Sequence, residues 1–202
     1  MKFYVFDYMS TAKSQFAQFK LLGKATRIEP PHCEDCGARL GPLLRVPPHR
    51  YRIKRGELGD LITDGMVFAV SERFKKSYAT SSLRGLAFSP EPVQLLGTDL
   101  IYFMATPKHT RVLLDEEASG LVACKVTGCE KCRVMSVTKF DRIRVKEGTW
   151  QGEDVFLIAS ITQTMATADF VSFVESHGFT NFRFVDPERY QVDFSISVGT
   201  PK

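Results

Sequence analysis

The chain has 202 residues, of which 44% are hydrophobic and 25% are charged, and its mean hydropathy is −0.11. This composition is typical of a globular protein and excludes collagen, coiled coils and extended disorder. The 27 Lys and Arg residues outnumber the 23 Asp and Glu residues, and the resulting formal charge of +4 is far from that of a densely basic nucleic-acid-binding protein.

The first part of the chain favours short strands around one helix. Residues 24–50 carry several prolines and glycines together with Cys33 and Cys36, and this pattern predicts a loop region. Ser71 is a suitable N-cap for a helix over residues 72–82. Alternation and β-branched or aromatic residues predict strands at residues 2–8, 50–55, 60–70 with a central turn, and 86–96.

The second part contains the same kinds of element. Residues 100–105 and 111–114 are predicted to be strands on either side of a turn at Pro107. Thr167 repeats the N-cap signal, before a helix that Gly178 ends. Further strands are predicted at residues 155–161 and 191–198. Because strands and helices do not alternate in a strict βαβ order, the sequence predicts an α+β fold rather than a doubly wound sheet.

A shift of 96 positions indicates an internal duplication. The residues that coincide in this register are Cys33 with Cys129, Cys36 with Cys132, Glu34 with Glu130, Gly56–Glu57 with Gly152–Glu153, Leu61–Ile62 with Leu157–Ile158, Phe74 with Phe170, and Phe88 with Phe184. The two N-caps coincide as well. We therefore expect two diverged, duplicated α/β halves, at about residues 24–98 and 120–198, that share a zinc-knuckle core within a single compact unit over residues 1–202.

The cysteines predict a metal site. A structural zinc ion takes four ligands in a tetrahedron, and a Cys-x-x-Cys turn presents two thiolates to one ion. Here 92 residues separate the second cysteine of one pair from the first of the other, so the ion would join the two halves. Four protein ligands leave no open coordination position, which makes the ion structural rather than catalytic. The prediction is one structural Zn²⁺ per chain, with the ligands Cys33, Cys36, Cys129 and Cys132.

The residues around these cysteines suggest how the centre is supported. A zinc tetrathiolate carries a formal charge of −2, which the nearby cations could offset; these are Arg39, Lys125, Lys131 and Arg133. Gly37 and Gly128 would ease a close approach of the backbone to sulfur.

Other interpretations of the cysteines remain open. A redox dithiol is one, although such a cysteine usually lies at a helix N-terminus after a strand. Two separate metal sites that use His32 or Cys124 are another, and a knuckle that no longer binds metal is a third. Cys124 has no partner at the knuckle spacing, and we expect it to be a small buried or free thiol.

The sequence predicts a non-enzymatic, cytoplasmic protein. It contains no dinucleotide-binding, P-loop, nucleophile-elbow or zinc-protease motif. The odd number of tightly paired cysteines favours a reducing compartment, and no segment approaches the roughly 20 apolar residues of a membrane span. The strip from Arg50 to Arg55 interleaves aromatic and cationic residues, as nucleic-acid-binding surfaces do, and an exposed strand would explain it equally well.

The chain resembles the myxobacterial double-CXXCG-motif family. Besides the two Cys-x-x-Cys pairs, the resemblance rests on residues 70–75 (VSERFK), 114–120 (LDEEASG), 147–156 (EGTWQGEDVF) and 177–181 (HGFTN). It spans about residues 30–190 in the family's order. It implies an immunity protein of the swarming-inhibition toxin system, which binds and neutralises a cognate protein toxin delivered by a sibling cell.

The sequence also departs from this family's pattern. Gly37 keeps the glycine that follows the second cysteine, but Arg133 replaces it in the second knuckle. The expected function is that of a toxin-binding immunity protein of a polymorphic toxin system, with no membrane partner and no nucleic-acid partner. The alternative is a zinc-ribbon-like nucleic-acid-binding module that uses the strip from Arg50 to Arg55.

Overall fold

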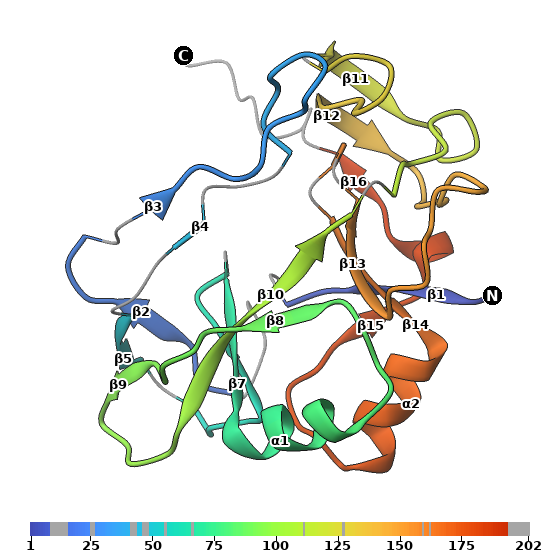
Figure 1. Cartoon of the computed structure of the whole chain (residues 1–202). Coiled ribbons are helices and arrows are strands. Elements are labelled where there is room, and N and C mark those ends of the chain that lie inside the picture. The colour runs from blue at the N-terminus through green and yellow to red at the C-terminus, as the bar shows by residue number, and fades with distance from the viewer. Residues whose placement is uncertain are drawn as a thin grey trace, which may run out of the picture.

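Two short helices lie side by side on one face of a mixed β-sheet (Figure 1), and this arrangement confirms the predicted α+β class. The computed structural model describes residues 1–8, 16–24, 27–40, 44–45, 49–54, 56–65, 67–110, 112–126, 128–158, 160–161 and 163–193. Side chains are described for these residues except at 44–45, 109, 123–125 and 192–193.

The main sheet has eight strands in the order β15-β1-β14-β13-β10-β7-β6, with β8 paired to β10. Their bounds are β1 (Phe3–Phe6), β6 (Leu61–Thr63), β7 (Phe68–Ser71), β8 (Leu86–Phe88), β10 (Tyr102–His109), β13 (Val155–Ile158), β14 (Gln163–Thr167) and β15 (Phe184–Val185). All of the pairings are antiparallel except that between β10 and β13.

Three smaller sheets carry the rest of the strands. The first contains β2 (Phe19–Leu21), β5 (Arg50–Ile53) and β9 (Gln94–Leu96). The second contains β11 (Val122–Val126), β12 (Met135–Phe140) and β16 (Val192–Asp193), and the third is the pair β3 (Arg27–Ile28) and β4 (Leu44–Arg45). The predicted strand at residues 191–198 is thus confirmed only at β16, and residues 194–198 lie outside the described part.

The helices are α1 (Glu72–Thr80) and α2 (Ala168–Ser176), followed later by the short 3-10 helix η1 (Pro187–Arg189). Both predicted N-caps are confirmed. The Ser71 hydroxyl accepts from the Phe74 N–H at 3.2 Å, and the Thr167 hydroxyl accepts from the Phe170 N–H at 3.3 Å. No helix in the described part of the chain has the length and apolar character needed to cross a membrane.

The core lies on both faces of the main sheet. On the helix face, Phe74 and Phe170 pack edge to face, with ring centroids 6.2 Å apart, above Phe68 of the sheet. On the other face the small sheets supply the covering side chains, with Tyr51 of β5 in one cluster and Phe140 of β12 in another. The alternation of strand residues between two buried faces explains the nearly continuous apolar runs of β7 and β13.

The predicted turn at Pro107 is wrong. Strand β10 continues through this residue, which pairs with Leu86 of β8. Proline has no N–H, and the hydrogen bond at this point is donated by the next residue, from the Lys108 N–H to the Gly85 carbonyl at 2.7 Å. The predicted strand at 111–114 is likewise not formed over its described residues, where Leu114 makes only an isolated bridge.

The two helix-bearing regions share the same strand register. In β10 and β7, Met104 pairs with Ala69, and in β1 and β14, Val5 pairs with Met165. Ala69 and Met165 are 96 positions apart, whereas Val5 and Met104 are 99 apart. Strand β1 thus pairs with the strand that precedes α2, although it lies at the start of the chain. Strand β10 pairs in the same way with the strand that precedes α1.

An aspartate supports each helix start in the same way, and it is buried at Asp60 and half-buried at Asp154. The Ser71 hydroxyl donates to Asp60 Oδ1 at 2.7 Å, and the Thr167 hydroxyl donates to Asp154 Oδ1 at 2.9 Å. The backbone repeats the match, because the Ser71 N–H donates to the Asp60 carbonyl and the Thr167 N–H to the Asp154 carbonyl. Each cap hydroxyl thus accepts from its helix while donating to a carboxylate.

These aspartates also link the two regions reciprocally. The N–H of Arg84, after α1, donates to Asp154 Oδ2 at 2.8 Å. The N–H of Thr180, after α2, donates to Asp60 Oδ2 at 3.0 Å. The exit of each helix therefore binds the carboxylate that supports the start of the other helix.

Asp60 makes stability depend on pH. Burial opposes ionisation, but hydrogen bonds from Arg73, Ser71 and Thr180 outweigh it and hold the pKa of Asp60 below its ordinary value of 3.8. A depressed folded pKa stabilises the native state above the unfolded pKa, and this stabilisation is lost as pH falls through the folded pKa. We expect the urea concentration at the unfolding midpoint to decrease as the pH is lowered below about 4, and to decrease less steeply in Asp60→Asn. Equal pH dependence in the two proteins would contradict this role of Asp60.

Candidate metal centre

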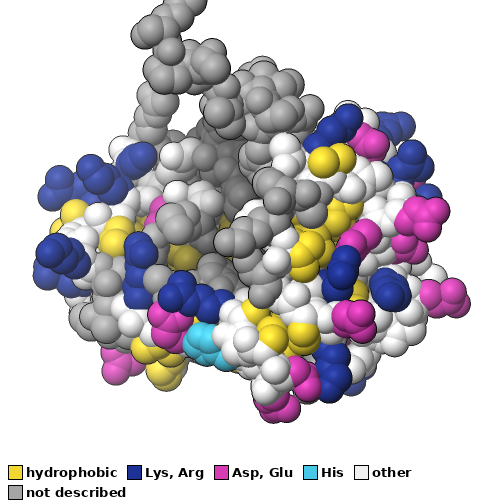
Figure 2. All heavy atoms as spheres, turned by 90° about the horizontal axis from the view of Figure 1, so that it is seen from above, with side chains coloured by type: hydrophobic (Ala, Val, Ile, Leu, Met, Phe, Trp, Pro, Cys, Tyr) yellow, Lys and Arg dark blue, Asp and Glu magenta, His cyan; other side chains and the backbone are white. Residues whose placement is uncertain are grey.

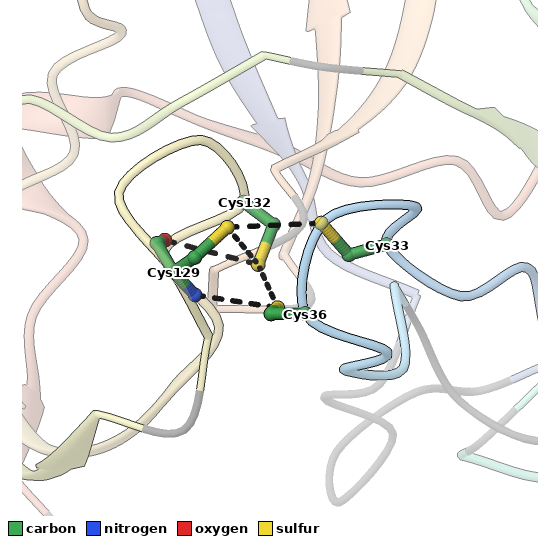
Figure 3. Close-up of side chains that lie close together, drawn as sticks. All are labelled: Cys33, Cys36, Cys129 and Cys132. Carbon is green, nitrogen blue, oxygen red and sulfur yellow. Dashed lines mark hydrogen bonds between the residues drawn. The ribbon is translucent and has the colours of Figure 1, made fainter.

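Two hairpins bring the four predicted ligands together. Cys33 and Cys36 lie between β3 and β4, and Cys129 and Cys132 lie between β11 and β12. Figure 3 shows the four side chains pointing from these two loops toward a common centre. Among the described residues they form the one group of three or more potential ligands, with all Sγ atoms within 4.8 Å of one another.

The sulfur positions fit a tetrahedral ion. Metal–sulfur bonds of about 2.3 Å require sulfur–sulfur distances of about 3.8 Å in a tetrahedron. The Sγ atoms of Cys33 and Cys129 are 3.8 Å apart, those of Cys36 and Cys132 are 3.6 Å apart, and those of Cys129 and Cys132 are 3.9 Å apart. A disulfide would need about 2.05 Å, so these four cysteines are free thiols arranged as a ligand set.

The two knuckle turns have the same backbone geometry. The Gly37 N–H donates to the Cys33 carbonyl, and the Arg133 N–H donates to the Cys129 carbonyl, both at 2.8 Å. Gly37 and Arg133 both have positive φ, of 71° and 48°. The residue after each second cysteine thus turns the chain through a left-handed conformation, which is the position where the resemblance leads one to expect glycine.

The pKa values of Cys36 and Cys132 are shifted in opposite directions. Backbone N–H groups of Ala38 and Cys129 donate to the Cys36 sulfur and lower its pKa from 9.0 to about 7. Burial raises the pKa of Cys132 to about 11. A metal that binds all four sulfurs must displace the remaining protons, so metal affinity would rise with pH.

The nearby cations are paired with carboxylates. Lys131 Nζ lies 2.6 Å from Asp35 Oδ1, and this ion pair joins the two knuckles. Asp35 and Lys131 are themselves 96 positions apart, a signal that the sequence comparison overlooked. Of the other predicted cations, Arg39 binds Glu29 and Arg133 binds Glu116, while the Lys125 side chain lies outside the description. These carboxylates therefore compete with the thiolates for the positive charge of the cations.

The predicted role of Gly128 is confirmed. A Cβ atom at this position would lie 2.5 Å from Cys132 Sγ and 2.5 Å from the Val134 nitrogen. Any side chain would therefore displace a ligand. At Gly37 a Cβ would meet nothing within 4 Å, so its positive φ is the reason for glycine there.

Arg133 provides a direct test of backbone strain in the second knuckle. We expect Arg133→Gly to be more stable than Arg133→Ala by about 1–2 kcal/mol, because only glycine adopts positive φ without a steric penalty. Both variants lose the hydrogen bonds to Glu116, of which the Nε–Oε1 bond is 2.7 Å long, so this loss cancels in the comparison. Urea unfolding of the two variants measures the difference, and equal stabilities would contradict it.

The alternative cysteine interpretations find less support. His32 is outside the cluster, and its Nε2 lies 4.0 Å from Glu29 Oε2. The Cys124 side chain lies outside the described residues. Both Cys-x-x-Cys pairs are in turns, whereas a redox dithiol favours a helix N-terminus.

A cleft of about 430 Å³ lies where α1 begins, beside the start of β10. Its polar lining includes Asp60, Ser71 and Arg73, which bond to one another: Arg73 Nη2 lies 2.6 Å from Asp60 Oδ2. These groups hold the helix start in place. The sequence did not reveal them, because the partners are 11 and 13 positions apart.

Comparison of the chain with models of known protein families and with curated proteins found no match.

Proposed function

We propose that the chain is a non-catalytic immunity protein of the bacterial cytoplasm that binds and neutralises a cognate protein toxin. The observation that carries the proposal is the convergence of the two Cys-x-x-Cys pairs on one centre, because the family resemblance rests first on these pairs. A closed four-ligand centre leaves no coordination position for a substrate, so it supports the fold and leaves the function to the protein's surface.

The metal in this proposal is one structural zinc ion per chain. Tetrahedral four-sulfur sites select zinc or iron, and zinc supplies folding energy without redox chemistry. Elemental mass spectrometry of untagged protein is expected to give about one zinc per chain, as for a structural site. A value below about half, or iron in its place, would contradict the proposal.

The immunity function is tested with the product of the adjacent reading frame. Cells that express this product should die or stop growing, and co-expression of the chain should restore growth. The purified proteins should then form a stable complex that co-elutes in size-exclusion chromatography. A toxic product that the chain neither binds nor neutralises would overturn the proposal.

The second candidate is a nucleic-acid-binding module. The observation that favours it is the exposure of Arg50, Arg52 and Lys54 along β5 and its continuation; Arg55 lies outside the described residues. This function predicts RNA or DNA affinity that falls steeply as salt concentration rises. Filter binding between 50 and 200 mM salt separates the two candidates.

We further propose that the chain arose from two copies of one unit, at about residues 1–98 and 99–193, that exchange their first strands. The shared registers of β1 and β10 and the reciprocal contacts of Asp60 and Asp154 support this. A protease site inserted in the segment 97–100, which is exposed except at the half-buried Thr98, tests it. The cut pieces should co-elute and unfold in one transition that depends on protein concentration; pieces that separate without denaturant would contradict the exchange.

A further inference from the structure

The β2-β5-β9 sheet has one buried face and one exposed face. Phe19, Tyr51 and Leu95 point into the core. Since side chains alternate along a strand, the residues beside them face outward. The exposed cations of this outward set, called the basic face here, are Lys20, Arg50, Arg52 and Lys54.

The strand register concentrates these like charges. Lys20 lies directly opposite Arg52 in the antiparallel pair β2-β5, and Arg52 is in register with Leu96 of β9. Like charges at directly opposite positions destabilise a sheet. Figure 2 shows Lys and Arg side chains on both sides of the molecule, and those on the left lie on the side where Figure 1 places β2, β3 and β5. The sheet therefore keeps an arrangement that its own stability does not favour.

The basic face differs from several other groups of cations in the molecule, which are paired with carboxylates. Arg142 and Arg144 are also close in sequence, but Glu188 binds both, at 3.6 and 2.9 Å. Arg73 and Arg133 likewise bind carboxylates. Within the described part of the chain, none of the four cations of the basic face forms an ion pair.

We propose that the basic face docks an acidic surface of a protein partner. The proposal rests on the proposed function, under which the partner is the cognate toxin. Four exposed cations on one sheet face, none of which forms an ion pair with a described residue, complement carboxylates, accelerate association and reject basic surfaces.

Two observations favour a protein over a nucleic acid. Leu96 is 45% exposed beside Arg52, and a mixture of arginine and apolar surface is typical of protein interfaces. Single-stranded nucleic acids instead stack their bases on exposed aromatic rings. The aromatic residues of this sheet, Phe19 and Tyr51, are 1% and 0% exposed, so they offer no such platform.

The test compares two double variants with the same change in charge. Lys20→Gln/Arg52→Gln removes the central pair of the basic face. Lys108→Gln/Lys146→Gln removes two exposed cations elsewhere that also form no ion pair among the described residues. Stopped-flow binding to the purified toxin is measured at low and high salt, and thermal unfolding checks that each variant folds.

The basic-face variant should bind the toxin at least tenfold more weakly, with a slower association rate and a flatter salt dependence. The control should stay within about twofold. Equal loss in both variants, or none in either, overturns the docking face while the immunity function stands. A wild-type chain that neither binds nor neutralises the toxin overturns the immunity function instead. Salt-sensitive binding to homopolymeric RNA that only the basic-face variant loses assigns the face to nucleic acid and overturns the proposal.

Discussion

Replacement of one ligand of the four-cysteine centre, in Cys33→Ser, is expected to lower the free energy of unfolding by more than about 4 kcal/mol. Cys33 is buried, and its sulfur lies 3.8 Å from that of Cys129 on the other knuckle. The free energy of metal binding is part of the free energy of folding in such sites. Because the centre joins two loops that are 96 residues apart in sequence, its loss frees both of them.

Chemical unfolding with and without a strong chelator measures this effect. Chelation of the reduced wild type should reproduce the loss, and Cys33→Ser should be insensitive to the chelator. Cys124→Ser is the control for loss of a thiol, since its sequence spacing places it outside the ligand set. If Cys33→Ser and the control were equally stable, the four cysteines would not hold a structural metal.

Gly85→Ala is the second change for which we expect a large effect. Gly85 has φ of 111°, and a Cβ atom there would lie 1.9 Å from the Val155 carbonyl oxygen. Neither the left-handed conformation nor the contact with backbone can relax cheaply, since the Val155 N–H also bonds to the adjacent Arg84 carbonyl at 3.1 Å. We expect a loss of about 4 kcal/mol or more, measured by urea unfolding.

Gly65→Ala separates the effect of the left-handed conformation from the effect of the steric contact. Gly65 also has positive φ, of 89°, but a Cβ there would meet nothing within 4 Å. Its substitution should cost only about 1–2 kcal/mol, the price of the left-handed conformation alone. Equal losses at the two glycines would show that the contact between Gly85 and β13 does not matter.

Asn181 occupies the position after α2 that corresponds to Gly85 after α1. It is 96 positions from Gly85 and also has positive φ, of 67°. Asparagine tolerates this conformation better than most residues, and its side-chain amide donates to the Leu61 carbonyl at 2.6 Å. Gly85 and Asn181 thus adopt the same left-handed backbone conformation at corresponding positions after α1 and α2.

The sequence by itself determined the features that depend on neighbouring residues. Ser71 and Thr167 cap helices because each hydroxyl reaches an N–H only three residues ahead. The Cys-x-x-Cys spacing defines a knuckle for the same reason. The four-cysteine group was also predictable, because two such turns complete one tetrahedral shell.

The tertiary structure alone decided which distant segments meet. The proline at position 107 predicted a turn, but pairing with β8 keeps β10 extended there. Nothing local in β1 or β10 specifies that each completes the hairpin of the other region. The contacts of Asp60 and Asp154 span up to 120 and 70 positions and exist only once the strands are in register. Such pairings depend on the whole sheet, whereas periodicity and capping report only on the nearest turns of chain.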